Sequence, residues 1–227
     1  MLENVPGLLA DSRLRRLRRG LNRLGYRTRA RVFNAADFGV PQRRHRLILL
    51  AARYFTPTFA PPTLHRVSVR QTIGGLQLPG TSGDPLHDIT EKRSDKITRL
   101  IQAIPTDGGS LVDAPLEFQL ACHVRHPGFR DVYGRMKWDG LAPTITGGCI
   151  NPSKGRFLHP DQNRAVTLRE AALLQGFPIH YAFSLDRGKY RAAEMIGNAL
   201  PPEFVRRHAA AVRSQLQETI LGRATSE

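Results

Sequence analysis

Residues 26–52 read YRTRARVFNAADFGVPQRRHRLILLAA, and this segment carries the clearest secondary-structure pattern of the chain. Over residues 26–33 arginines alternate with apolar or small side chains, which predicts a half-exposed β-strand. Residues 46–52 contain the run LILL, which is typical of a buried strand, and residues 34–41 form the loop before it. We expect the two strands to form a hairpin at a sheet edge. Without parallel neighbours, that hairpin would expose backbone pairing groups and an apolar face.

The segments on either side of the hairpin have different patterns. Leucines recur at helical spacing over residues 11–24, which predicts a helix that Gly25 ends. Prolines cluster over residues 56–63 and predict a linker. Between residues 66 and 151 glycine and proline interrupt the chain often. We therefore expect loops, short strands and one helix over residues 96–104, as in a recognition lobe rather than a layered sheet.

Helical periodicity returns after this region. Thr167 and Glu170 have the spacing of a capping box, so a helix should begin there and end at the sequence GFP of residues 176–178. Pro202 is suited to the first position of another helix. The remaining elements that we expect are a helix over 191–196, a turn over 198–202 and a final helix over 203 to about 221.

Charge and cysteine content indicate the class of protein. The 227 residues carry 34 Lys and Arg, of which 29 are Arg, against 19 acids, a net charge of +15. Arginine contacts phosphate and guanine edges through its fork of donors, so the balance favours a nucleic-acid partner over a merely solvated basic face. Two cysteines make no disulfide framework, and no signal peptide or apolar span of membrane length is recognised, so we expect a cytoplasmic protein. Cys122, His123 and His126 fit a polar loop better than a zinc site.

Four polar clusters could carry chemistry. They are Glu3-Asn4-Val5, the run PQRRHR at 41–46, the segments APTIT at 142–146 and NPSKGR at 151–156, and the turn IGNALPP at 196–202. Arginines that lead into a core strand are costly unless they face an anion or a base, and small hydroxyls with cations suit phosphate contacts. Each cluster alone also fits a structural role: a surface acid, a solvated charge cluster or a simple turn. Their order along one chain is much more specific.

In that order the motifs resemble those of the DNA cytosine-5 methyltransferases, the Dcm-like enzymes of bacterial restriction-modification systems. ENVPGL at 3–8 is similar to the ENV motif of that family, and FGVPQRRHR at 38–46 to its QxRxR motif. LREAALLQGFP at 168–178 resembles its RExxxLQxFP segment, and IGNALPP its closing GNAVPP motif. YGRMKWD at 133–139, with APTIT, is also typical of the family.

The resemblance implies an α/β fold: part of a Rossmann-like, S-adenosylmethionine-dependent methyltransferase domain plus a small, loop-rich target-recognition domain. Residues 1–62 would belong to the catalytic domain, 63–164 to the recognition domain, and 165–227 to the catalytic domain again. The family flips a cytosine out of duplex DNA, attacks its C6 with the cysteine of a Pro-Cys-Gln motif, and transfers a methyl group from S-adenosylmethionine to C5.

The resemblance also assigns roles to particular residues. Glu3 would contact N3 and the exocyclic amine of the cytosine, Arg46 its O2, and Arg44 would help to place the base and the catalytic loop. Asn198 and Ala199 would lie near the methionine part of the cofactor. The expected contacts to DNA are Arg125, Arg130, Arg135 and Lys137, with the hydroxyls of Thr144, Thr146 and Ser153.

Two family motifs are missing from the printed sequence, the glycine-rich FxGxG loop and Pro-Cys-Gln. Cys122 and Cys149 lack the Pro-Cys-Gln context, so neither is expected to be the nucleophile. We therefore expect no methyl transfer by this chain alone. Three accounts stay open: a subunit of a split enzyme completed by a chain with the missing motifs, a truncated gene or fragment, or a DNA-binding remnant without catalysis.

Overall fold

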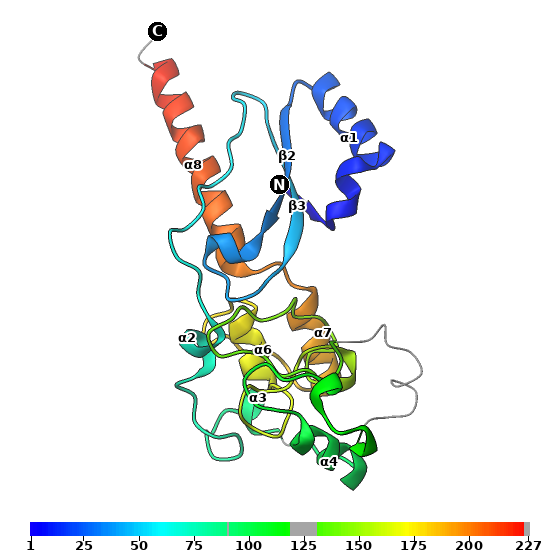
Figure 1. The fold of residues 1–227 in the computed structure, drawn as a ribbon. Helices are drawn as coiled ribbons and strands as arrows, with labels where there is room; N and C mark the ends of the chain where they lie inside the picture. Colours follow the sequence, from blue (N-terminus) through cyan, green and yellow to red (C-terminus); the bar gives the residue numbers. More distant parts are fainter. Residues whose placement is uncertain (90, 119–130, 225–227) are drawn as a thin grey trace. The chain divides into compact units, whose positions relative to one another are not determined.

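A computed structural model describes residues 1–89, 91–118 and 131–224 of the chain. The chain folds into two compact units (Figure 1). Unit 1 contains residues 1–40, 44–66 and 200–227, and unit 2 contains residues 41–43 and 67–199. Among the described residues, no helix is both long and apolar enough to cross a lipid bilayer.

Unit 1 is built on a three-stranded sheet in the order β1-β3-β2. The strands are β1 (Leu2–Asn4), β2 (Arg27–Asn34) and β3 (His45–Ala52), and both outer strands run antiparallel to β3. The predicted hairpin is thus confirmed as β2 and β3, with β1 on the other side of β3. The alternation in β2 is confirmed as well, because its three arginines are exposed and the residues between them are partly buried.

Helices cover both faces of this sheet, so the expectation of an exposed apolar face was wrong. Helix α1 (Ser12–Arg23) packs Leu14 against Leu47 and Leu49 on one face. Helix α8 (Pro202–Ala224) packs Phe204 against the other face, which Ile48 and Leu50 form. Figure 1 shows α1 and α8 on opposite sides of β2 and β3. The alternation of β3 side chains between the two faces supplies an apolar surface to each helix.

The segment predicted as a linker is part of unit 1. The backbone N–H of Thr58 donates to Oε1 of Gln215 on α8 at 2.8 Å, and Ala60 is buried. The ring of Phe59 lies 4.8 Å from that of Phe33, centroid to centroid. Prolines interrupt regular structure in this segment, but its apolar side chains complete the core beside α8. The free energy of burying these side chains outweighs the conformational entropy that a mobile linker would keep.

Unit 2 consists of short helices joined by loops, and its described residues form isolated β-bridges rather than a sheet. The prediction of a loop-rich lobe is confirmed, but its described residues form isolated bridges in place of the short strands that we expected. Its helices are α2 (Val69–Ile73), α3 (Pro85–Asp88), α4 (Asp95–Ala103), α6 (Leu168–Leu174) and α7 (Lys189–Asn198), with single 3-10 turns at Leu111–Asp113, Leu116–Phe118 and Pro152–Lys154. Two further 3-10 turns, Pro6–Ala10 and Ala35–Phe38, belong to unit 1.

Helices α6 and α7 pack within unit 2, although the expected boundary between the recognition and catalytic domains lay between residues 164 and 165. Leu174 and Ile196 share one buried cluster with Val69, Ile73 and Leu86 of α2 and α3. The change of unit therefore falls between residues 199 and 200. The predicted capping box of α6 is present, with the hydroxyl of Thr167 accepting from the N–H of Glu170.

Candidate functional site

Glu3 and Arg46 form an ion pair at the edge of the unit 1 sheet. Glu3 lies opposite Ile48 in the register of β1 and β3, and Arg46 is two residues before Ile48 on the same face of β3. Diagonal neighbours in a sheet are within reach of long side chains. Nε of Arg46 accordingly lies 2.8 Å from Oε1 of Glu3, and the two side chains are 18% and 30% exposed. The antiparallel register therefore brings together two of the three residues to which a catalytic role was assigned.

Arg44, the third of these residues, is buried beside the pair. Its backbone N–H donates to the side chain of Asn34 at 3.1 Å, and its carbonyl accepts from Ala35 at 2.8 Å. Burial lowers the pKa of Arg44 to about 10, and the charge of Arg46 acts in the same direction while that of Glu3 opposes it. Arg44 remains protonated at neutral pH, so the cluster holds two guanidinium groups and one carboxylate. Such a set can bind a planar group that has donors and acceptors on one edge.

Gln42 connects three of the sequence motifs inside unit 2. Its amide nitrogen donates to the carbonyl of Leu174 at 3.0 Å and to Oε1 of Gln175 at 2.6 Å. Its amide oxygen accepts from the N–H of Ile145 at 3.0 Å. Gln175 in turn donates to the carbonyl of Ala199. Gln42 and Gln175 are fully buried, and both lie in family-like motifs, but neither was expected to have a functional role.

The turn expected to face the cofactor begins at the end of α7. Gly197 lies so close to the 146–147 peptide that an added Cβ would be 2.1 Å from the carbonyl carbon of Thr146. Asn198, the last residue of α7, is exposed, and its amide has no hydrogen bond to a described residue. The carbonyl of Ala199 is taken by Gln175. Of these positions, the side chain of Asn198 is therefore the one available to a ligand.

The residues expected to bind DNA differ in how accessible they are. Lys137 and Thr146 are exposed. The hydroxyl of Thr144 donates to the carbonyl of Arg43 at 2.7 Å, and that of Ser153 to the side chain of Asn151 at 2.9 Å. Both hydroxyls thus have a partner within unit 2. Arg125 and Arg130 lie outside the described residues, as do Cys122, His123 and His126.

The structure corrects the interpretation of Arg135 as a DNA contact. This side chain is 1% exposed, and burial lowers the pKa of its guanidinium. The guanidinium donates to the carbonyls of Ile101, Ile104, His159 and Gln162 and to the side chain of Asn163. A buried cation needs such a full set of acceptors. Arg135 therefore fixes loops of unit 2 and cannot reach a phosphate.

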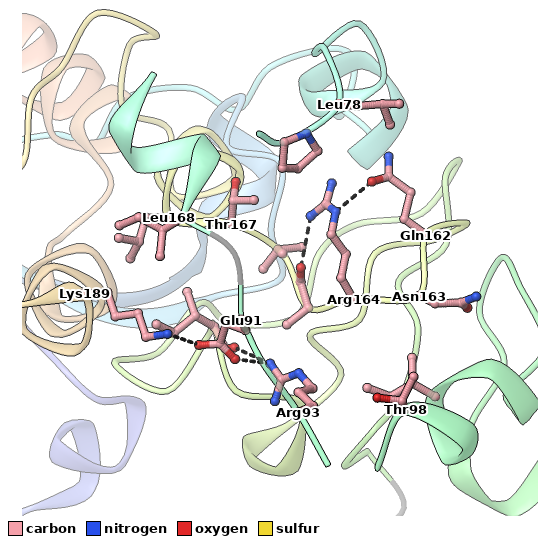
Figure 2. Close-up of a pocket in the computed structure, with 16 residues that line it drawn as sticks. Leu78, Glu91, Arg93, Thr98, Gln162, Asn163, Arg164, Thr167, Leu168 and Lys189 are labelled. Atoms are coloured by element: carbon pink, nitrogen blue, oxygen red, sulfur yellow. Dashed lines mark hydrogen bonds and ion pairs between the residues drawn. The ribbon is translucent and has the colours of Figure 1, made fainter. Parts of the chain in front are cut away.

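Unit 2 contains a cavity of about 460 Å³. Glu91 lies in its wall between Arg93 and Lys189, and Lys189 is 2.8 Å away (Figure 2). Arg164, also in the wall, donates to Gln162 and to Glu170. None of the residues to which a catalytic, cofactor-binding or DNA-binding role was assigned lines this cavity, and each of its three cations has a carboxylate partner. Arg93 and Arg164 pair with acids two and six residues away in the chain, whereas the pair of Lys189 and Glu91 joins residues far apart in the sequence.

A family model for the C-5 cytosine-specific DNA methylases matches residues 1–214. The chain belongs to this family. Among the relatives of this methylase chain, the Type II methylase M.HgiDII of Herpetosiphon aurantiacus is 36% identical over 230 residues, which cover 95% of the chain and 64% of the relative. The Type II methyltransferase M1.BsuMI of Bacillus subtilis is 31% identical over 212 residues, 90% of the chain and 48% of that relative. The methylase chain thus spans less than two thirds of either relative.

Solved structures agree with the fold. A crystal structure described as a prophage-encoded DNA modification methyltransferase from E. coli has a TM-score of 0.62 at 19% identity, over 95% of this chain and 68% of the other. The crystal structure of S. pombe Dnmt2 methyltransferase has a TM-score of 0.53 at 18% identity, over 94% and 65%. The expected α/β fold with part of a Rossmann-like domain is therefore confirmed for this member of the methylase family.

Proposed function

We propose that this chain holds the target cytosine and contacts duplex DNA as part of an enzyme that transfers a methyl group from S-adenosylmethionine to C5 of that cytosine. The observation that carries the proposal is the ion pair of Glu3 and Arg46 beside the buried, charged Arg44. By their resemblance, the ENV and QxRxR motifs assign contacts with the base to Glu3 and Arg46, and the placing of the base and the catalytic loop to Arg44. Membership of the C-5 cytosine-specific DNA methylase family supports the same reaction.

The residues of this cluster would polarise the cytosine ring. C6 of a neutral cytosine is a poor electrophile, and positive charge at N3 draws electron density from it. The carboxyl group of Glu3 would hold a proton between itself and N3 and accept from the exocyclic amine. Arg46 would donate to O2, and the fixed charge of Arg44 would favour electron density that moves toward this edge. Fixed charges of this kind are most effective where a flipped base excludes water.

S-adenosylmethionine would supply the methyl group when bound. The exposed amide of Asn198 can donate to or accept from such a cofactor, but its neighbour Ala199 offers only backbone, and its carbonyl is taken. The described residues of this turn fit one edge of a cofactor site rather than a whole one. We therefore limit the role of this chain to the base and the DNA.

The nucleophile would come from a complementary segment that carries the Pro-Cys-Gln and FxGxG motifs, on a separate chain or elsewhere in the same protein. Cys149 is unsuited to the task because burial raises the pKa of its thiol to about 12, and attack requires the thiolate. Duplex DNA and this complementary segment are thus the two partners that we propose. The alternative function is DNA binding without catalysis, which the net charge of +15 favours.

Complementation separates these possibilities. The chain would be combined with the segment of M.HgiDII that it does not cover, and transfer of labelled methyl groups to unmethylated duplex DNA would be measured. We expect no transfer by either part alone and transfer by the pair. Gel shifts of the chain alone provide the second readout. If the chain retards DNA but the pair transfers no methyl group, the result favours the alternative. If the chain does not retard DNA and the pair transfers no methyl group, both functions are contradicted.

A further inference from the structure

One face of helix α1 consists of arginine. Arg16, Arg19 and Arg23 follow one another at i, i+3 and i+7, the spacing of a straight stripe along a helix, and all three are exposed. The opposite side of the helix carries Leu14 and Leu21, which pack against the sheet. The stripe therefore points away from the core of unit 1. Its three arginines belong neither to the base-holding residues nor to the recognition motifs.

Nothing in the described parts of the chain neutralises this stripe. Helix α1 contains no acidic residue, and Asp11 at its N-cap is taken by Arg13 at 2.7 Å. Cations three and four residues apart on a helix repel one another. On α8, by contrast, Arg206 and Arg207 both pair with Glu203. The stripe thus carries a repulsion that a bound anion would relieve.

We propose that the α1 stripe binds the phosphate backbone of duplex DNA at a place separate from the base-holding cluster. From Arg16 to Arg23 the helix rises about 10 Å, and duplex DNA carries one charge for every ~1.7 Å of its axis, so the stripe can reach several phosphates. A guanidinium donates two parallel hydrogen bonds to a phosphate. The surface would hold DNA without regard to sequence and would add to the contacts that the proposed function requires.

The sheet offers a matched control. Arg27, Arg29 and Arg31 of β2 are exposed as well. Arg29 and Arg31 pair with Leu50 and Ile48 in the sheet register, so they lie on the face opposite α1. Replacing these three arginines removes three positive charges from unit 1, as the change in α1 does, but from β2 instead of α1.

The test compares R16Q/R19Q/R23Q with R27Q/R29Q/R31Q by fluorescence anisotropy on a 20-base-pair duplex of random sequence, between 50 and 200 mM KCl. Each phosphate contact contributes about 0.9 to the slope of log affinity against log salt. We expect R16Q/R19Q/R23Q to lower the magnitude of that slope by about 2.7. The affinity of the wild type should then fall about 40-fold more than that of the variant over this salt range. The control variant R27Q/R29Q/R31Q should change the slope by less than about 1. R16K/R19K/R23K should restore most of the slope.

If both triple variants lower the slope equally, the effect comes from net charge alone and the proposal is overturned. An unchanged slope in R16Q/R19Q/R23Q would also overturn it. Loss of affinity for a single-stranded RNA of equal length, with none for the duplex, would also contradict it. Glutamine suits a helix nearly as well as arginine, and thermal melts identify a variant that fails to fold. The assay contains no cofactor and needs no methyl transfer, so failed complementation would leave the α1 stripe standing while the proposed reaction fell.

Discussion

Replacing Gln42 with glutamate would test the connection that holds unit 2 together. The change preserves the shape of the side chain and exchanges one amide nitrogen for an oxygen. In the wild type that nitrogen donates to the carbonyl of Leu174 at 3.0 Å and to Oε1 of Gln175 at 2.6 Å. At neutral pH the new carboxylate would direct an oxygen at both acceptors, while it would still accept from the N–H of Ile145.

The cost follows from burial, because Gln42 is fully buried. Two hydrogen bonds become repulsive contacts, and a buried charge without a partner costs about 3–5 kcal/mol. The introduced carboxyl group should respond by raising its pKa above the unfolded value of about 4.3. A raised pKa in the folded state favours folding below the unfolded pKa, and this advantage is lost as the pH rises. The penalty of Gln42→Glu should therefore be small near pH 4 and largest at neutral pH.

Urea denaturation of wild type and Gln42→Glu, followed by circular dichroism from pH 4 to pH 8, measures this difference. Hydrogen exchange at the N–H of Ile145 reports on the same site, and Gln42→Ala, which lacks both amide atoms, should expose that N–H to exchange at every pH. A Gln42→Glu variant as stable as wild type at pH 7, or one whose loss of stability grows toward low pH, would show that the buried amide is not needed at this site.

Three further predictions concern buried positions. Arg135→Met should lower the free energy of unfolding by about 3–5 kcal/mol, because it leaves buried carbonyls without a donor, and urea melts would measure the loss. Gly197→Ala should cost more than about 2 kcal/mol in thermal melts, because its Cβ would lie 2.1 Å from the carbonyl carbon of Thr146 and 2.3 Å from the nitrogen of Gly147. Burial lowers the pKa of His208, so the stability that it contributes is complete above the unfolded pKa of about 6.5 and is lost as the pH falls below it. His208→Leu should reduce this acid sensitivity in urea midpoints between pH 7 and pH 5.

Patterns within a few residues predicted most of the elements. Alternation predicted the hairpin of β2 and β3, and the spacing of Thr167 and Glu170 predicted the capped start of α6. Both signals are local because their partners are close in the chain. The position of Glu3 beside Arg46 could be assigned from motifs, but the register of β1 and β3 that joins them could not.

The errors concern contacts between distant residues. Arg135 was expected to contact DNA because it lies in the segment that resembles a target-recognition domain. The carbonyls that surround it come from residues more than 20 positions away, so sequence proximity could not reveal its burial. Residues 56–63 were predicted to be a linker because prolines cluster there. Proline content carries no information on α8, which follows more than 130 residues later and whose Phe204 shares a buried cluster with Ala60. Gln42 lay in a quoted motif, but only the fold reveals that its amide joins residues 145 and 174.

The proposed function depends most directly on Glu3 acting on the base. Methyl transfer by the complemented complex should be compared for wild type, Glu3→Gln and Glu218→Gln, the last an exposed acid on α8 of the same unit. We expect Glu3→Gln to lower the rate of transfer at saturating DNA by at least about 100-fold while DNA affinity stays within a few-fold, and Glu218→Gln to change neither. Equal losses of rate and affinity, or an unchanged rate in Glu3→Gln, would contradict this role of Glu3.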